Sequence, residues 1–100
     1  MSALKPLKND ELSQAMRQLD VDWSAIPGQG LIRIIPTDSF TTGFALVAKI
    51  AGLADQLNHH PELTLRTDEV EITLITHAVG DITRADLLFA KEVDQLLEAK

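Results

Sequence analysis

Two adjacent histidines and a third one further along the chain are the residues best suited to chemistry in this sequence. The stretch QLNHHPEL (56–63) places His59 and His60 side by side before Pro61, at the end of a long apolar segment. The remaining histidine of the chain is His77. Imidazole both gives and takes protons near neutral pH, so three such rings around a small polar ligand would make an acid–base site.

The residues alone leave two other interpretations of the histidine pair open. Histidines near the C-terminal end of a helix interact with its last carbonyl groups and its dipole, and Pro61 is a common stop signal beyond such an end. The three rings could also bind a metal ion, but adjacent residues rarely aim both rings at one ion, and HExxH spacing is absent. We therefore rank a metal site lowest of these interpretations.

Nucleophilic catalysis and phosphate binding have little support in the sequence. The chain has no cysteine and no GxSxG motif, so an activated nucleophile is not indicated. The glycines of GQG (28–30) lack the rest of a GxGxxG pattern and are better explained as a hairpin turn.

The composition excludes several classes of partner. A formal charge of −6 offers no broad basic surface to a phosphate backbone, so we expect no direct binding to nucleic acid. The absence of cysteine excludes disulfides and fits a reducing compartment. No apolar run reaches membrane-spanning length, and MSALKPLKND at the start lacks the apolar centre of a signal peptide. We therefore expect no membrane association and a cytoplasmic protein.

The histidines must be positioned by one domain that mixes helices with strands. We expect residues 1–8 to form a flexible N-terminal arm and residues 9–100 to form a single domain. Apolar spacing predicts helices that start near residues 9, 40 and 84, and short or alternating apolar stretches predict strands over 31–35, 63–67 and 69–76. This order indicates an α+β fold with the helices on one face of the sheet.

Helix caps and apolar stripes refine this outline. Thr37 or Asp38 is the expected cap of the long helix, and TRAD (83–86) fits a capping box in which Asp86 reaches back. The long helix is apolar on two stripes, one containing Phe40 and Phe44 and the other containing Ile50. We expect one stripe to pack on the sheet and the other against a neighbouring helix.

The histidines belong to a longer pattern that resembles a known family. Asp55-x-x-x-His59-His60-Pro61-Glu62 is followed by Val70-x-Ile72-x-Leu74-x-Thr76-His77 and then by Thr83-x-x-Asp86. This pattern resembles the pterin-4a-carbinolamine dehydratases, also called 4a-hydroxytetrahydrobiopterin dehydratases, over about residues 10–97. The resemblance implies a four-stranded antiparallel sheet with three helices packed on one face, and assembly into homodimers or tetramers.

The resemblance also implies a reaction and a site. Family members remove water from 4a-hydroxytetrahydropterin to give quinonoid dihydropterin, a step in tetrahydrobiopterin recycling. His60 would be the principal general acid/base, His59 and His77 would bind and polarise the hydroxyl group, and Asp86 would orient a histidine. The implied substrate-binding residues are Asp55, which takes the place of a glutamate in the family, and Pro61, Glu62 and Thr76. No metal and no organic cofactor is implied.

Three residues depart from the family pattern. Leu63 stands where the family usually has Trp, and Thr67 stands where it has Tyr. After the third histidine the family usually has a Gly-Gly or Ala-Gly pair, and this chain has Gly80 and Asp81 there. Losing two aromatic residues removes flat apolar surface, so we expect aromatic replacements at Leu63 and Thr67 to improve pterin affinity. Two function classes follow: a dehydratase with an altered pocket, or a dehydratase-like assembly factor such as a RuBisCO assembly chaperone of carboxysomes.

The segment EVEITLIT (69–76) leads to a prediction about association. This strand is long, and an unpaired edge strand of this length invites pairing with another chain. We expect a two-fold homodimer, most simply through pairing of such an edge into a continuous sheet, with a tetramer as a further step.

Overall fold

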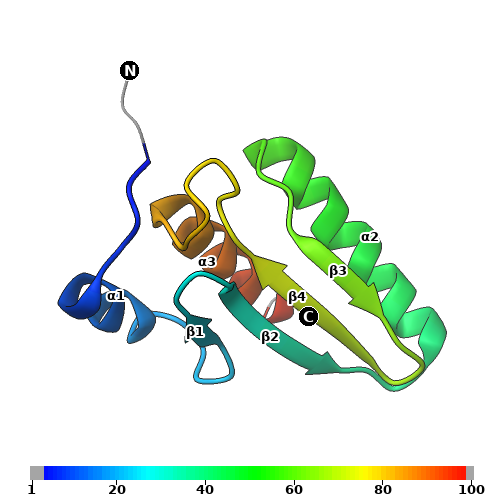
Figure 1. Ribbon diagram of the computed structural model, residues 1–100. Helices are drawn as coiled ribbons and strands as arrows, with labels where there is room; N and C mark the ends of the chain where they lie inside the picture. Colours follow the sequence, from blue (N-terminus) through cyan, green and yellow to red (C-terminus); the bar gives the residue numbers. More distant parts are fainter. Residues whose placement is uncertain (1–3, 99–100) are drawn as a thin grey trace.

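The helices of the chain gather on one face of a small antiparallel sheet. The computed structural model describes residues 4–98, and its four strands form one sheet (Figure 1). The predicted α+β fold is therefore confirmed. In chain order the elements are α1 (Asn9–Met16), β1 (Ser24–Ile26), β2 (Gly30–Pro36), α2 (Phe40–Leu57), β3 (Glu62–Leu65), β4 (Glu69–Leu74) and α3 (Arg84–Glu98).

The strand order corrects one prediction. The strands are arranged β1-β2-β4-β3, and every neighbouring pair is antiparallel. β4 therefore lies inside the sheet, paired with β2 on one side and with β3 on the other, so residues 69–76 do not supply the edge suggested for pairing with a second chain. The hairpin between β3 and β4 supplies the second neighbour. Within residues 4–98 the edge strands are β1, a three-residue strand that the apolar pattern did not predict, and β3.

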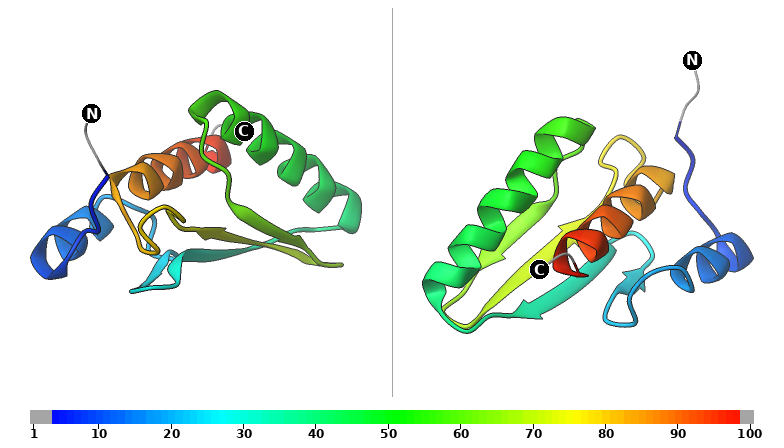
Figure 2. Two further views of the ribbon diagram at one scale, coloured as in Figure 1. Left: turned by 45° about the horizontal axis from the view of Figure 1, so that its top comes forward. Right: turned by 180° about the vertical axis from the view of Figure 1, so that it is seen from behind.

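Alternation along the strands separates a buried face from an exposed one. On β4, Val70, Ile72 and Leu74 are fully buried, whereas the residues between them are half-buried, which confirms the predicted one-sided strand. The buried face lies under α2 and α3, as the views from the side and from behind show (Figure 2). Among the residues that the structure describes, no helix covers the opposite face (Figure 2), which exposes Ile34 of β2.

α2 packs closely on the sheet along one side only. Its cap is Ser39, whose hydroxyl oxygen accepts a hydrogen bond from the Thr42 amide, so the cap predicted at residue 37 or 38 lies one or two residues too early. Gly43 is buried, and a Cβ there would lie 2.8 Å from the side chain of Leu65. Phe40 and Phe44 are 54% and 62% exposed, so the prediction that a neighbouring helix covers their stripe is wrong.

α3 begins at the predicted capping box. The Thr83 hydroxyl oxygen accepts from the Ala85 amide at 3.2 Å, and an oxygen of Asp86 accepts from the Thr83 amide at 2.9 Å. The helix then buries an apolar face against the sheet that includes Leu87 and Val93. These caps fix the direction in which the helix leaves the sheet.

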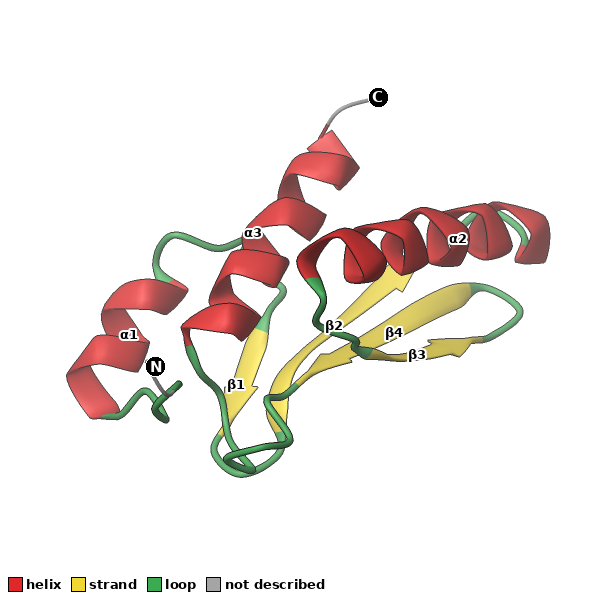
Figure 3. Cartoon of the chain, turned by 90° about the horizontal axis from the view of Figure 1, so that it is seen from above, coloured by secondary structure: helices red, strands yellow, loops and turns green. Residues whose placement is uncertain are grey.

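α1 lies beside α3 at the β1 side of the molecule (Figure 3). The Leu7 amide donates to the Ile82 carbonyl at 2.9 Å, so the predicted N-terminal arm is attached to the domain at this residue. Residues 1–3 of that arm and residues 99–100 of the predicted domain lie outside the described residues. None of the helices described over residues 4–98 has the length and apolarity needed to cross a membrane.

Candidate active site

The end of α2 is closed by backbone groups rather than by the histidine side chains. Asn58 caps the helix in the left-handed conformation, with φ 52° and ψ 42°, and the His59 amide donates to the Ala54 carbonyl at 3.1 Å. The structure therefore assigns helix termination to Asn58 and the backbone of His59. Both imidazoles remain available for other contacts.

His59 contacts a buried carboxylate from the start of α3. Its Nε2 atom lies 2.6 Å from Oδ1 of Asp86, 27 residues further along the chain. The Asp86 side chain is fully buried, whereas the His59 side chain is 16% exposed. Phe89, one turn further along α3, packs beside the imidazole with ring centroids 6.3 Å apart. The pair thus joins a buried anion to a ring that reaches the surface.

Two threonines complete the surroundings of Asp86. Its second oxygen accepts from the Thr76 hydroxyl at 2.8 Å and from the Thr83 amide at 2.9 Å. Because the single Thr76 proton is used on Asp86, the Thr83 hydroxyl must donate across the 2.7 Å contact between the two threonine oxygens. A carboxylate only accepts, so Nε2 of His59 is the donor to Asp86, and Nδ1 is the nitrogen left for a substrate.

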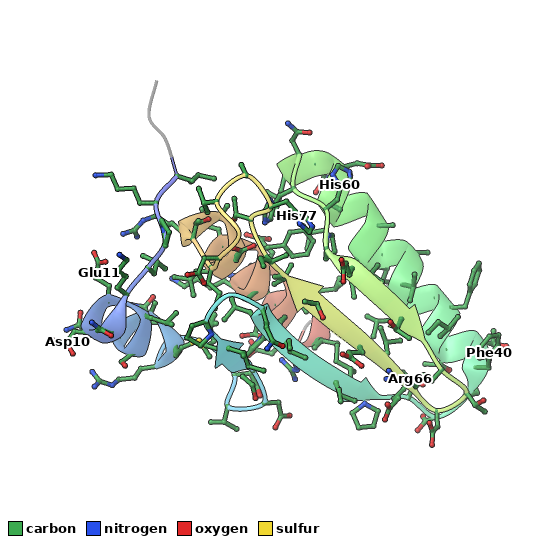
Figure 4. All side chains as sticks on the ribbon, viewed as in Figure 1. Asp10, Glu11, Phe40, His60, Arg66 and His77 are labelled. Atoms are coloured by element: carbon green, nitrogen blue, oxygen red, sulfur yellow. The ribbon has the colours of Figure 1, made fainter. Side chains whose placement is uncertain are left out.

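His60 and His77 are the exposed members of the histidine set. Nε2 of His60 lies 3.2 Å from Oδ1 of Asp55, and their side chains are 61% and 82% exposed. His77 is exposed in the turn between β4 and α3. Figure 4 labels both rings at the same end of the molecule, one following α2 and the other following β4. Asp86, held by His59, therefore fulfils the prediction that it both caps α3 and reaches the histidines.

Four surface clefts formed by the described residues lie away from the histidines. One of these, of about 610 Å³, lies between α2, α3 and the end of β2. Neither this cleft nor the other three is lined by His59, His60 or His77. The convergence of the three rings on one cavity therefore stays a prediction. His59 is half-buried, whereas His60 and His77 are exposed.

The remaining predicted site residues are distributed over two faces of the sheet. Thr76 is buried, and its hydroxyl donates a hydrogen bond to Asp86, so it orients that carboxylate and is not exposed to a substrate. Glu62 starts β3 opposite Thr73, and it is exposed where its neighbour Leu63 is half-buried. The alternation of a strand therefore directs Glu62 away from the helices. Pro61 is half-buried between the histidines and this strand.

Leu63 and Thr67 are the two positions where the family usually has an aromatic residue. Leu63 packs against the apolar core, where a larger ring would compete with its neighbours. Thr67 lies in the turn between β3 and β4, at the end of the hairpin remote from the histidines (Figure 1). Thr67 is therefore distant from the histidines of its own chain (Figure 1). That aromatic replacements at Leu63 and Thr67 improve pterin affinity stays a prediction.

Sequence reasoning missed two residues of the site. Thr83 belongs to the family pattern and to the capping box, but neither predicts that its hydroxyl donates to Thr76. Phe89 was not assigned, although it is fully buried and flanks His59. The capping-box spacing was a usable signal for Thr83, whereas nothing local distinguishes Phe89 from an ordinary core residue. Over the described residues, no group of three or more His, Asp or Glu side chains is arranged to hold a metal ion.

Comparisons with known proteins show the family of this chain. The family model described as pterin 4 alpha carbinolamine dehydratase matches residues 5–96. Proteins named "Putative pterin-4-alpha-carbinolamine dehydratase" are similar over most of their length. The one from Rubrobacter xylanophilus is 34% identical over 91% of this chain and 84% of its own. The one from Natronomonas pharaonis is 35% identical over 92% and 96%.

Two solved structures share the fold. A transcriptional coactivator/pterin dehydratase from Brucella melitensis has a TM-score of 0.83 and 30% identity, covering 92% of this chain and 98% of its own. A pterin dehydratase-like protein identified as a RuBisCO assembly factor in the alpha-carboxysome has a TM-score of 0.59 and 27% identity, covering 77% and 93%. With the family model matched over nearly the whole chain, the protein belongs to the pterin 4 alpha carbinolamine dehydratase family.

Proposed function

We propose that this protein is a hydro-lyase that dehydrates 4a-hydroxytetrahydropterin to quinonoid dihydropterin. The observation that carries the proposal is the contact between His59 and the buried Asp86, next to two exposed imidazoles at the same end of the molecule. Such a set combines one ring of fixed orientation with two that can reach a ligand. Family membership supplies the substrate class.

The elimination needs two proton transfers, and the histidines can supply both. One proton is delivered to the departing hydroxyl group as its carbon–oxygen bond breaks, so that water leaves. A second proton is removed from a ring nitrogen, whose electron pair forms the new carbon–nitrogen double bond. In this proposal His60, paired with Asp55, is the principal general acid/base, while His59 and His77 bind and polarise the hydroxyl group.

The test is dehydration of 4a-hydroxytetrahydropterin, measured against the spontaneous reaction. His60→Ala is expected to lower turnover by ~10²–10⁴, the usual contribution of a positioned general acid or base. His59→Ala and His77→Ala are expected to lose less turnover and to raise KM. Gln56→Ala, an exposed change on the last turn of α2, is the matched control and leaves the rate unchanged. A wild-type protein no faster than background would overturn the proposal.

A second candidate function is assembly of another protein, because the site is open and one structural relative is a RuBisCO assembly factor. The first candidate is favoured: the likeness to the coactivator/pterin dehydratase has the higher TM-score and covers more of the chain. Purified RuBisCO mixed with this protein distinguishes the two. Co-elution that survives His60→Ala, together with an inactive wild type, would support the assembly function instead.

The proposal includes assembly into a homodimer or tetramer. It also places the protein in the cytoplasm, because a chain without cysteine fits a reducing compartment. Two features of the described chain support self-association. β3 is an edge strand with one side unpaired, and Phe40 and Phe44 are exposed on α2. Light scattering at micromolar concentration is expected to give at least twice the mass of the chain. A monomer there would contradict this part.

A further inference from the structure

His77 differs from the other two histidines in how its position is set. His59 contacts Asp86 and His60 contacts Asp55 through their imidazoles. Within residues 4–98, the His77 ring has no comparable side-chain partner among the hydrogen bonds of the structure. The location of this ring therefore depends on the backbone that carries it.

That backbone is a tight turn with little support from the core. Thr76 and Asp81 form an isolated antiparallel bridge, and the Gly80 amide donates to the Thr76 carbonyl at 2.9 Å. The side chains between them, including Ala78 and Val79, are exposed. The turn is thus held at its two ends. Thr76 is fixed by its bond to Asp86, which leaves Asp81 as the second attachment.

Asp81 attaches the turn to a distant part of the chain. Its Oδ1 atom accepts from the Gly28 amide at 2.9 Å, across 53 residues of sequence, and from the Ile82 amide at 2.8 Å. Gly28 lies in the hairpin turn between β1 and β2 with φ +78°, a conformation that favours glycine. Ile82 is fully buried. The Ile82 bond is local, between neighbouring residues, whereas the Gly28 bond attaches the His77 turn to the neighbouring hairpin.

We propose that Asp81 is a positioning residue for His77, holding the turn of residues 76–81 against the β1–β2 hairpin so that the third imidazole faces the site. The inference rests on the proposed function, because it assigns a role in the same reaction. The inference also assigns a role to Asp81, one of the residues that depart from the family pattern. The three histidines then each depend on one aspartate, two through the ring and the third through the backbone.

The electrostatics of Asp81 agree with this role. The Gly28 amide, and to a smaller extent the Ile82 amide, lower the pKa of Asp81 because both stabilise the charged form. Lys8 adds a smaller favourable charge. Asp81 therefore stays ionised, and accepts only, at any pH where the histidines could exchange protons.

Two substitutions separate the hydrogen bonds from the charge. Asp81→Asn keeps a carbonyl oxygen that can accept both amides, since both bonds end on the same atom. Asp81→Ala removes both bonds. We expect Asp81→Ala to lower kcat/KM by ~10- to 100-fold, the effect of displacing a reacting group by about 1 Å, and Asp81→Asn to stay within about threefold of wild type.

A double-mutant cycle with His77→Ala shows whether the effect passes through His77. If Asp81 only positions that ring, Asp81→Ala has little further effect once the ring is gone. An equal loss of kcat/KM in the presence and absence of His77 would overturn the proposal, because Asp81 would then act through another group. The cycle also excludes a general loss of folding, which would lower both backgrounds alike.

Nuclear magnetic resonance provides a readout that does not need activity. In Asp81→Ala, we expect faster exchange of the Gly28 and Ile82 amides and shifted His77 ring signals, with His59 ring signals unchanged. Asp81→Asn should resemble wild type. Unchanged His77 signals in Asp81→Ala would overturn the positioning role. If wild type proves inactive, the proposed function fails, and these spectra alone decide whether Asp81 positions His77.

Discussion

α3 carries two aspartates about two turns apart, and each accepts three hydrogen bonds. Asp86, in the first turn, accepts from one imidazole, one hydroxyl and one backbone amide. Asp94 accepts from the Trp23 indole at 2.7 Å, from the Arg33 guanidinium at 2.7 Å and from the Asp20 amide at 2.9 Å. The two carboxylates accept the same number of hydrogen bonds. The Asp86 side chain is fully buried and that of Asp94 is 13% exposed, but the main difference between them is the donors.

This difference explains why only one end of α3 can support acid–base chemistry. The indole of Trp23 and the guanidinium of Arg33 keep their protons under all ordinary conditions. The Arg33 guanidinium also lies 3.7 Å from a carboxylate oxygen of Asp20 and 3.9 Å from one of Asp22, so neighbouring negative charges balance its positive charge. The imidazole on Asp86 can gain or lose a proton and has a second nitrogen for a ligand. What distinguishes the candidate active site at Asp86 from the structural network at Asp94 is therefore the side chain that donates to the carboxylate: an imidazole in the first case, an indole and a guanidinium in the second.

Among the aspartate substitutions that test this comparison, the largest effect is expected from Asp86→Asn. In the variant the amide oxygen can still accept from the Thr76 hydroxyl and the Thr83 amide, but the NH2 group then faces Nε2 of His59. The ring must move its proton to Nδ1 to accept from that group, so Nδ1 can no longer accept from a substrate. We expect turnover to fall about 10²-fold as His59 loses its orientation and tautomer, and unfolding free energy to fall by about 1.5–3 kcal/mol as hydrogen bonds to a charged group are lost.

Both quantities are measured on one preparation, by the dehydration assay and by urea unfolding. The orienting role would be refuted by a variant that loses stability while its kcat and KM remain those of wild type. In that case the two aspartates of α3 would be equivalent, and the comparison between them would no longer locate the site.

Asp94→Asn is the matched change at the other end of the helix. It weakens the charge-assisted bond to Arg33, which is worth about 1.5–3 kcal/mol where both groups are largely buried. We expect a loss of unfolding free energy in that range and kcat/KM within about twofold of wild type, because none of the Asp94 partners lies among the histidines. A tenfold loss of activity in the folded variant would show that the two ends of α3 are coupled.

Local patterns were sufficient to predict the elements that carry the site. The bounds of α2, the alternation of β4 and the capping box at Thr83 depend on residues within one or two turns, or within one strand, of each other. The capping box even predicted that Asp86 would lie at the helix start. Its contact with His59 required the family resemblance, because nothing local links residues 27 positions apart.

Long-range pairing accounts for what could not be predicted. Alternation showed that β4 is buried on one face, but it carries no information about whether both edges are paired. The apolar stripe with Phe40 and Phe44 predicted burial, and it cannot distinguish cover by the same chain from cover by another. Asp81 was noted only as an unusual residue, since its partner Gly28 lies in a different turn.

The smallest effect is expected from Asp81→Asn, and it depends on pH. Asp81 is half-buried, and its two amide partners lower its pKa below the ordinary value of 3.8. The unfolded chain therefore binds a proton before the folded one as the pH falls. The stability that Asp81 contributes is fully present above the ordinary pKa of 3.8 that applies to the unfolded chain, and it is lost as the pH falls through the lower folded value. Urea midpoints of wild type and Asp81→Asn should differ slightly at pH 6 and converge toward pH 3. A difference that stays constant from pH 6 to pH 3 would mean that the charge of Asp81 does not stabilise its bonds to Gly28 and Ile82, and that only their geometry matters.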